Sequence, residues 1–246
     1  MTVFLFLAFH WYTSAFCQTF FLHRYGAHGM FVMSRGWERF FYVLTFLTQG
    51  SSYLNPRAYA LMHRMHHAHS DTRLDPHSPV FHKSLFGMMR RTLDVYLQIA
   101  ANKKYHADSA QGFHYPEWPS FDRVADSILA RLLWATGYVT FYVFYAEAWW
   151  QYLFLPLHFF MGPVHGAIVN WCGHKYGYQN YDNKDHSKNT LFWDIFCMGE
   201  LMQNNHHRFG LRPNFASRWY ELDPTYPFLW LFQKLGVIRF LAPGYR

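Results

Sequence analysis

The feature that most restricts the fold is the near absence of charge from residues 132–172. This stretch contains no Lys or Arg, and Glu147 is its only acidic residue. It holds two apolar runs, LLWATGYVTFYVFY and YLFLPLHFFMGPVHGAIVNW, on either side of the turn-like AEAWW. Each run is about long enough to cross a bilayer, which needs roughly 20 residues. We therefore expect two membrane-spanning helices, at about 129–147 and 150–171, joined by a short loop.

The N-terminal segment is a third candidate span, because residues 1–22 contain no acidic or basic side chain. A cleaved signal peptide would have a basic start and a small-residue cleavage site. Neither stands out here, so we expect the helix to be retained. The predicted fold class is an all-α membrane protein, with three transmembrane helices and a helical cytoplasmic cap in a single domain over 1–246.

The positive charges lie outside the charge-poor stretches 1–22 and 132–172. The net charge is +7, and all 22 Lys and Arg fall in residues 24–131 and 175–246. The positive-inside rule then places two blocks, about 23–128 and 172–246, in the cytoplasm and the 146–150 loop outside. Basic segments beside a membrane attract anionic lipids or an anionic substrate. Nucleic acid is a poor alternative for a chain that is 51% hydrophobic.

Three further segments are expected to be helical. The run WERFFYVLTFLTQGSSY is too short in its apolar part to span and is predicted to lie near the interface. Residues 84–101 suggest an amphipathic helix. The C-terminal YPFLWLFQKLGVIRFL is predicted to be an interfacial helix.

The three cysteines limit the possible cofactors. Cys17, Cys172 and Cys197 form no CxxC pair. Three thiols can build neither a four-cysteine metal site nor a four-cysteine iron–sulfur cluster. We interpret them as buried apolar side chains.

Two short motifs share one spacing, HRMHH at 63–67 and QNNHH at 203–207. On a helix, positions i, i+3 and i+4 share one face, so three side chains of each motif can reach a metal ion together. The two sets are His63, His66 and His67 in the first motif and Gln203, His206 and His207 in the second.

Two more pairs occur where expected spans meet the cytoplasm. Asn170 and His174 are four residues apart at the end of the last span. His23 and His28 are five apart, so they share a site only if the helix unwinds after His23. All four groups lie at one membrane surface and supply eight His, more than one tetrahedral zinc needs. Imidazole suits iron, zinc and copper, and two metal ions fit the count better than one.

Any one of these His alone could equally be a surface residue or a buried structural one, and only the joint pattern favours metal. The remaining nine are assigned other roles. For the histidines within the spans, we prefer a neutral imidazole enclosed in a cavity to a side chain that lines a substrate pocket. Six are expected in loops or at the surface (His69, His77, His82, His106, His114 and His186), and three within spans (His10, His158 and His165).

With these motifs in place, the chain resembles the integral-membrane fatty-acid desaturases, most of all the acyl-CoA type. HRYGAH resembles the HxxxxH box of that family, and HRMHH with AHSDTRLDPHSP resembles its second box and the following segment. NWCGHKYGY is similar to its NxxxH segment, and GELMQNNHH to its third box, GExxHNxHH. The resemblance covers about residues 20–225.

The resemblance implies an oxidoreductase that uses O₂ to introduce a double bond into a fatty acyl chain. It implies two Fe ions, a bent acyl tunnel, an acyl-CoA substrate and a separate electron donor of the ferredoxin, rubredoxin or cytochrome b5 type. Asn170 is expected as an indirect ligand and Gln203 as a possible one. The expected iron ligands are His23, His28, His63, His66, His67, His174, His206 and His207.

The chain departs from the family pattern in two places. The family usually has four spans, and three are found here. Gln203 stands where the third box has His, and an amide oxygen is a weaker, harder ligand than imidazole. Gln203 either ligates one iron, binds it through water or leaves the position open.

Four carboxylates near the boxes are candidates to orient imidazoles, although helix caps and solvated turns explain them equally well. They are Asp71, Asp75, Asp182 and Asp185.

Three alternatives remain. A hydroxylase of the same superfamily would give an alcohol instead of a double bond. A non-catalytic membrane metal-binding protein would bind iron without O₂-dependent turnover. A zinc hydrolase would need neither O₂ nor reductant.

Overall fold

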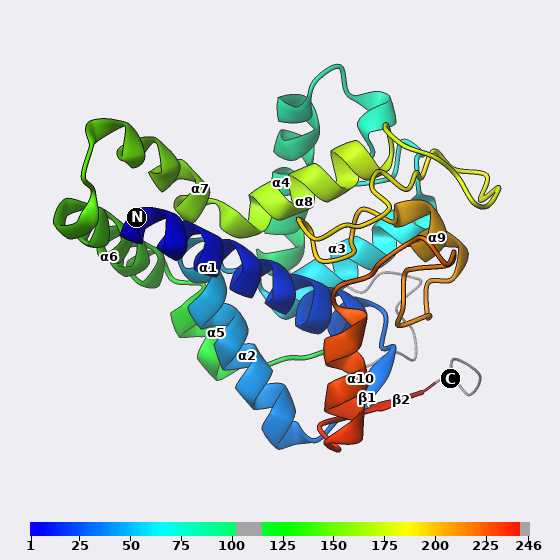
Figure 1. Ribbon diagram of the computed structural model, residues 1–246, viewed down its shortest axis with the longest axis horizontal. Coiled ribbons are helices and arrows are strands. Elements are labelled where there is room, and N and C mark those ends of the chain that lie inside the picture. Colours follow the sequence, from blue (N-terminus) through cyan, green and yellow to red (C-terminus); the bar gives the residue numbers. More distant parts are fainter. Residues whose placement is uncertain (102–114, 242–246) are drawn as a thin grey trace.

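The computed structural model describes residues 1–101 and 115–241, which are mostly helical (Figure 1). The α-helices are α1 (Thr2–Cys17), α2 (Arg35–Gln49), α3 (Pro56–His69), α4 (Leu85–Ala101), α5 (Pro119–Ala125), α6 (Ile128–Tyr145), α7 (Leu155–Phe159), α8 (Met161–Gly173), α9 (Gln203–Arg208) and α10 (Tyr226–Lys234). A π-helix, η1 (Gln18–Ala27), continues α1, and short 3₁₀ segments include η2 (Gly50–Ser52), η3 (Pro79–Phe81) and η5 (Trp149–Phe154).

Among the described residues, α6 alone is long and apolar enough by itself to cross a membrane. It confirms the helix expected at 129–147. The expected span at 150–171 is not one continuous helix, because the segment Trp149–Phe159 and α8 are bent by 75° relative to each other. Counted together, that pair forms a second candidate span.

Pro163 explains the break. A proline ring clashes with the carbonyl four residues earlier, here Phe159, and Pro is tolerated only in the first turn of a helix. Helix α7 accordingly ends at Phe159, and α8 begins two residues before Pro163. The Phe159 carbonyl accepts a hydrogen bond from the Ser51 hydroxyl at 3.1 Å. The sequence analysis did not foresee the break, because it counted only apolar length.

Helix α1 lies against α2, α6 and α8 (Figure 1). The amino group of Met1 is 3.3 Å from the Glu147 carboxylate in the loop that follows α6. The chain therefore enters α1 at the end of the molecule that carries this loop. It leaves α1 near α3 and α9, at the opposite end.

A two-stranded antiparallel sheet corrects the all-α expectation. Strand β1 (Phe31–Met33) pairs with β2 (Ile238–Phe240), with Phe31 opposite Phe240. The predicted C-terminal helix stops at Lys234, because Gly236 adopts a φ of 70° that favours glycine and turns the chain into β2. Helix α4 confirms the amphipathic helix expected at 84–101.

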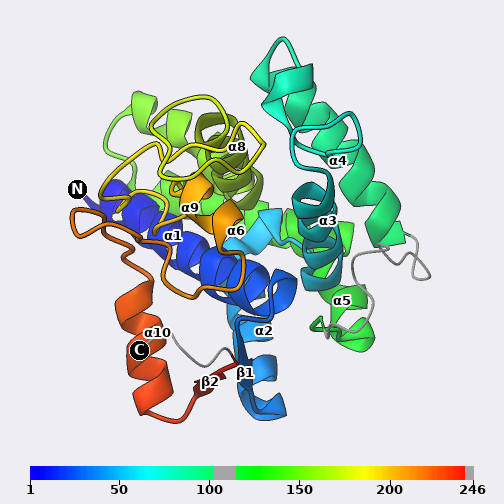
Figure 2. The same ribbon diagram turned by 90° about the vertical axis from the view of Figure 1, so that its right-hand side faces the viewer.

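The chain segments that carry the histidine motifs meet at one end of the molecule. Helix α3 packs along η1, and α9 contacts α8 (Figures 1 and 2). Residues 174–202, between α8 and α9, contain no regular helix or extended strand. A side chain of α9 holds this segment, since Asn204 Oδ1 accepts hydrogen bonds from the backbone N–H groups of Asn180 and Tyr181 at 2.8 and 2.9 Å.

Candidate metal centre

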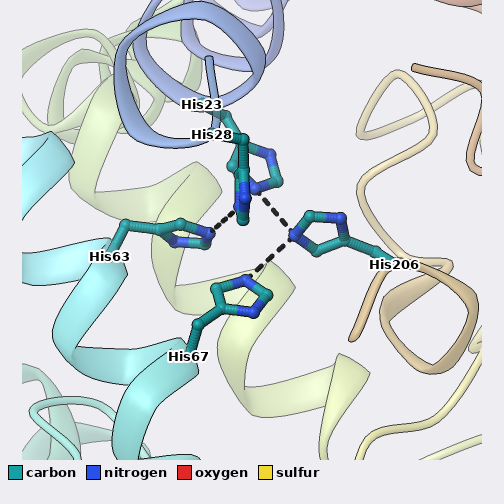
Figure 3. A group of neighbouring side chains, drawn as sticks. All are labelled: His23, His28, His63, His67 and His206. Atoms are coloured by element: carbon teal, nitrogen blue, oxygen red, sulfur yellow. Dashed lines mark hydrogen bonds between the residues drawn. The ribbon is translucent and has the colours of Figure 1, made fainter. Parts of the chain in front are cut away.

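Five imidazoles from η1, α3 and α9 converge on one point, where their ligand atoms lie within 4.8 Å of one another (Figure 3). We call this group the five-histidine cluster. It consists of His23, His28, His63, His67 and His206.

The π-helix brings the first two members together. In a π-helix the hydrogen bonds run from i+5 to i, so residues five apart lie one above the other. His28 N–H donates to the His23 carbonyl at 3.0 Å. The sequence analysis allowed this pair to share a site only if the helix unwinds after His23, but the helix continues through η1 to Ala27. The helix instead widens to the one spacing that aligns residues 23 and 28.

The other members come from short motifs on two helices. Asn55 caps α3 by accepting from the Ala58 N–H, and Pro56 starts its first turn. His63 and His67 are one turn apart on the face toward η1. His206 Nε2 from α9 lies 3.0 Å from the Nε2 atoms of both His23 and His67.

The remaining three boxed histidines form a second group beside the first, the three-histidine cluster of His66, His174 and His207. The ring centroids are 4.9–5.0 Å apart. Each of the HRMHH and NNHH motifs is therefore divided between the two clusters. His63 and His67 serve the first and His66 the second, and the adjacent His206 and His207 separate in the same way.

Every member of the three-histidine cluster has a carboxylate on its Nδ1 atom. Asp75 lies 2.9 Å from His66, Asp71 2.9 Å from His174 and Asp185 2.7 Å from His207. Hydrogen bonds at Nδ1 fix the ring orientation and raise the basicity of the other nitrogen. Three of the four carboxylates proposed from the sequence are thus confirmed as partners of imidazoles.

The prediction for the fourth carboxylate is wrong, and the sequence analysis missed another carboxylate that does contact an imidazole. Asp182 is exposed and accepts a hydrogen bond from the Lys184 backbone N–H in its own turn. Glu200 instead lies 2.6 Å from His23 Nδ1 and is also hydrogen-bonded to Thr19. Its only sequence signal was the GE pair that opens GELMQNNHH.

The donor set fits a cation. Because a carboxylate accepts at Nδ1, the neutral rings of His66 and His207 carry their proton there and present a lone pair at Nε2. Those two Nε2 atoms are 3.2 Å apart. His174 Nε2 is buried and has no hydrogen-bond partner among the described residues. Lone pairs this close repel one another unless a positive ion lies between them.

The spacing also fits a metal ion. Two nitrogens at right angles around an ion at about 2.1 Å are roughly 3.0 Å apart. In the five-histidine cluster, the Nε2 contacts of His23 with His206, His67 with His206 and His28 with His63 are 2.9–3.0 Å. Both clusters can therefore hold a metal ion.

Electrostatics keep the rings uncharged. Burial, followed by the neighbouring imidazoles, holds the pKa of each fully enclosed ring well below the ordinary histidine value. Burial alone would raise the pKa of Asp71 and Asp185, but their hydrogen bonds to His174 and His207 bring it well below the usual range. The rings with the strongly lowered pKa are His28, His63, His66, His67 and His206.

The two amide residues predicted as ligands both donate hydrogen bonds to backbone carbonyls. The Asn170 amide nitrogen donates to the Gly166 carbonyl at 2.8 Å, one turn earlier on α8. Gln203 is buried, and its amide nitrogen donates to the Glu200 carbonyl at 2.7 Å. Its side chain fills the space at Gly173, where a Cβ would lie 2.5 Å from Gln203 Cγ. Helix α9, which carries the QNNHH motif, begins at Gln203.

The other histidines mostly follow the sequence interpretation. His69 and His186 are exposed, His82 is half-buried, and His106 and His114 lie outside the described residues. The three within the expected spans are buried; His10 Nδ1 and His158 Nδ1 are 2.7 Å apart, and His165 packs edge-on against Trp11.

His77 is the exception, because it was expected in a loop or at the surface and is buried instead. Its ring lies 4.6 Å from that of His66, and with His66 and Asp75 it forms a third possible metal-binding group. Burial lowers its pKa to about 3.

Comparison with known sequences agrees with this geometry. The sequence profile described as fatty acid desaturase matches residues 1–238. The sn-1 stearoyl-lipid 9-desaturase of Anabaena variabilis is 28% identical over 94% of this chain and 80% of its own length. The Delta-9 desaturase-like 2 protein of Arabidopsis thaliana is 28% identical over 90% of this chain and 70% of its own length.

A third relative is named for a different activity. The hex-5-enoyl-[acyl-carrier protein] acetylenase of Moorena producens (strain JHB) is 24% identical over 88% of this chain and 70% of its own length.

Proposed function

The chain belongs to the fatty acid desaturase family and is an oxidoreductase that desaturates fatty acyl chains, and from this premise we propose that it works with two iron ions and O₂. The observation that carries the proposal is the pair of adjacent histidine clusters built from the same helices. A single structural zinc would need only four ligands.

The proposed ligand set follows the two clusters. One iron is held by the five-histidine cluster and the other by the three-histidine cluster. The second iron has fewer imidazoles, so its remaining positions are open to other ligands. Asn170 acts on that iron through a water, and Gln203 supplies an amide oxygen, bridges through water or leaves the position open.

The iron pair would supply the O₂ activation that removes two hydrogens from adjacent methylenes. The protein holds the imidazoles in place through the carboxylates of Asp71, Asp75, Asp185 and Glu200. One apolar ring, that of Phe215, packs against the five-histidine cluster, with its centroid 4.5 Å from that of His206 and 5.7 Å from that of His23. Such covering keeps water away from the reacting carbons.

We propose coenzyme A as the acyl carrier, because the Lys- and Arg-rich segments suit the phosphates of an anionic carrier. The names of two relatives specify a lipid-bound chain and a chain bound to acyl-carrier protein. The tests below therefore include all three carriers.

For the membrane, we propose an integral protein of one domain, 1–246, with the active site on the cytoplasmic face. Support comes from α6, the bent pair that ends in α8, and the absence of Lys and Arg between residues 132 and 172. We keep α1 as a further crossing helix. The blocks 23–128 and 172–246 would then be cytoplasmic.

This topology predicts opposite labelling at two exposed positions. In a variant lacking Cys172, we expect Cys at Trp149 to react with a membrane-impermeant maleimide added outside intact cells. Cys at Asp182 should react only after the cells are opened, because its segment is rich in basic residues. Outside labelling of both positions would contradict the topology.

Product analysis tests the function itself. We expect a host that expresses the chain to gain a monounsaturated fatty acid, seen by gas chromatography–mass spectrometry, when the host supplies an electron donor. Purified protein assayed with acyl-CoA, acyl-carrier-protein and lipid substrates then identifies the carrier. A hydroxylated product would favour the hydroxylase instead, and iron binding without any O₂-dependent product would favour a non-catalytic protein.

A further inference from the structure

A buried cation, Arg24, lies next to the five-histidine cluster and follows His23 directly in the chain; its side chain is 0% exposed. Its Nη2 donates to the Asp223 carboxylate at 2.7 Å, and its Nη1 donates to the Thr19 hydroxyl at 2.7 Å. Its Cζ atom lies 3.9 Å from the centre of the Phe215 ring. Because removing a charge from water is costly, an arginine this deeply buried beside a metal site needs a physical reason.

The π-helix places Arg24 against Thr19. These two residues are five apart, so the hydrogen-bond pattern that aligns His23 with His28 aligns them as well. The Thr19 hydroxyl accepts from the guanidinium and donates its own hydrogen to Glu200 Oε1. The other oxygen of the Glu200 carboxylate lies 2.6 Å from His23 Nδ1. A continuous line of contacts therefore runs from Arg24 through Thr19 and Glu200 to His23.

This line of contacts acts on the Glu200 carboxylate. Burial would raise the pKa of Glu200, but His23, the charge of Arg24 and the hydrogen bond from Thr19 hold it below its ordinary value. A carboxylate at Nδ1 makes an imidazole a stronger donor to a metal. When the negative charge of that carboxylate is drawn toward a cation and a hydroxyl, it attracts the proton on His23 Nδ1 less, and Nε2 gives less electron density to a metal ion.

The three-histidine cluster has a different set of carboxylates. Each of its imidazoles has an aspartate at Nδ1, and within the part of the chain that the structure describes these aspartates have no hydrogen bond or ion pair to Lys or Arg. Asp75, for example, accepts from the backbone N–H groups of Asp71 and His77. In the same described part, Glu200 is the one carboxylate that contacts the five-histidine cluster. The two clusters are therefore unequal electron donors.

We propose that Arg24 is a positioning residue that acts through Thr19 and Glu200 on the metal of the five-histidine cluster and makes this metal harder to oxidise. The proposal rests on the proposed iron-dependent function. The aspartates of the three-histidine cluster favour the oxidised form of their metal, whereas Arg24 restrains Glu200 and favours the reduced form of the other. The two metals then have different reduction potentials, and the higher one belongs to the five-histidine cluster.

Thr19→Val breaks the line of contacts and leaves the ion pair of Arg24 with Asp223 in place. Valine has a similar volume but no hydroxyl, so Glu200 loses a donor and attracts the His23 proton more strongly. In a redox titration of the iron-loaded full chain, followed by electron paramagnetic resonance, we expect the higher potential to fall by about 59 mV, a tenfold change in the equilibrium constant of a one-electron step. Thr19→Ser keeps the hydroxyl and should keep the potential.

Glu200→Gln should move the same potential upward, because a neutral amide oxygen attracts the proton on His23 Nδ1 less than a carboxylate does. Asp75→Asn is the matched variant in the other cluster, where it weakens the same kind of contact at His66 and should raise only the lower potential. A higher potential that stays constant or rises in Thr19→Val would overturn the proposal, because a purely structural role for Thr19 predicts no fall in potential.

Replacing Arg24 alone would leave Asp223 buried without its cation, and such a variant is expected to fold poorly. The double variant Arg24→Met, Asp223→Asn removes both charges and should lower the higher potential as Thr19→Val does. If the double variant does not fold, the Thr19 pair still decides the question.

Binding of Co²⁺ gives a readout that needs neither iron nor turnover, because the visible absorption of the ion reports its ligands. Glu200→Gln should weaken Co²⁺ binding by about tenfold, whereas Thr19→Val should bind it as tightly as wild type or more tightly. Two bound irons with unshifted potentials would overturn the inference and leave the proposed function standing. The expected order of Co²⁺ affinities in a protein that takes up no iron would do the reverse, and a protein that binds neither ion would overturn both.

Discussion

Replacing His66 or His207 by alanine is expected to abolish desaturation and to lower iron from about two ions per chain to about one. Each residue supplies one of only three imidazoles in its cluster, so two remain after the change. Loss of an outer partner of a metal ligand already weakens binding by about 10–100-fold, and loss of the ligand itself should cost more. Iron is measured by elemental analysis of the purified protein and activity by product formation.

His69→Ala is the matched control for this experiment. His69 lies on the same helix, α3, and is exposed instead of facing either cluster. Its replacement should leave both iron content and product unchanged. Full activity in both the His66 and the His207 variants would end the assignment of the three-histidine cluster as an iron site.

Gln203→His is expected to keep the fold and to give equal or higher iron occupancy in the three-histidine cluster. Gln203 is buried against Gly173, the residue that precedes His174 in the chain. Imidazole donates more electron density than a neutral amide oxygen. Gln203→Ala should lower occupancy at this one site, or change it little if water already provides the ligand.

The hydrogen bond from Gln203 to the Glu200 carbonyl means that the two substitutions change stability as well as the possible metal ligand. Both substitutions remove it, which costs about 1 kcal/mol of stability. Unfolding should therefore be followed beside iron content and turnover for the three proteins. A fall in iron content with His at 203, without loss of folded protein, would mean that the site is built around the amide.

Local sequence determined much of this protein. The lack of charge at 132–172 predicted the apolar helices because burial in lipid excludes charged side chains over a fixed length. The spacing of HRMHH predicted a shared helical face because side-chain direction repeats with the helix. Residue type and short-range geometry suffice for such conclusions, and all eight boxed histidines do come together.

Only the tertiary structure decided how the histidines are divided. Adjacent residues such as His206 and His207 point to different clusters. Which neighbour faces which cluster depends on where the fold places α9, because His206 meets His23 and His67 while His207 meets His66. The alignment of His23 with His28 depends on a π-helix, whose hydrogen-bond pattern leaves no plain mark in the sequence.

Long-range contacts also decided the partners of the imidazoles. Glu200 is 177 positions after His23 in the sequence, yet its carboxylate lies 2.6 Å from His23 Nδ1. Asp182 is closer in sequence to the third box than Asp71 is, but it contacts only its own turn, whereas Asp71 contacts His174. His77 is buried beside His66 although its surroundings in sequence are polar. The sequence determines which side chains are available and how they repeat along a helix. Packing determines which residues far apart in the chain interact, because only the folded chain brings them within hydrogen-bond distance.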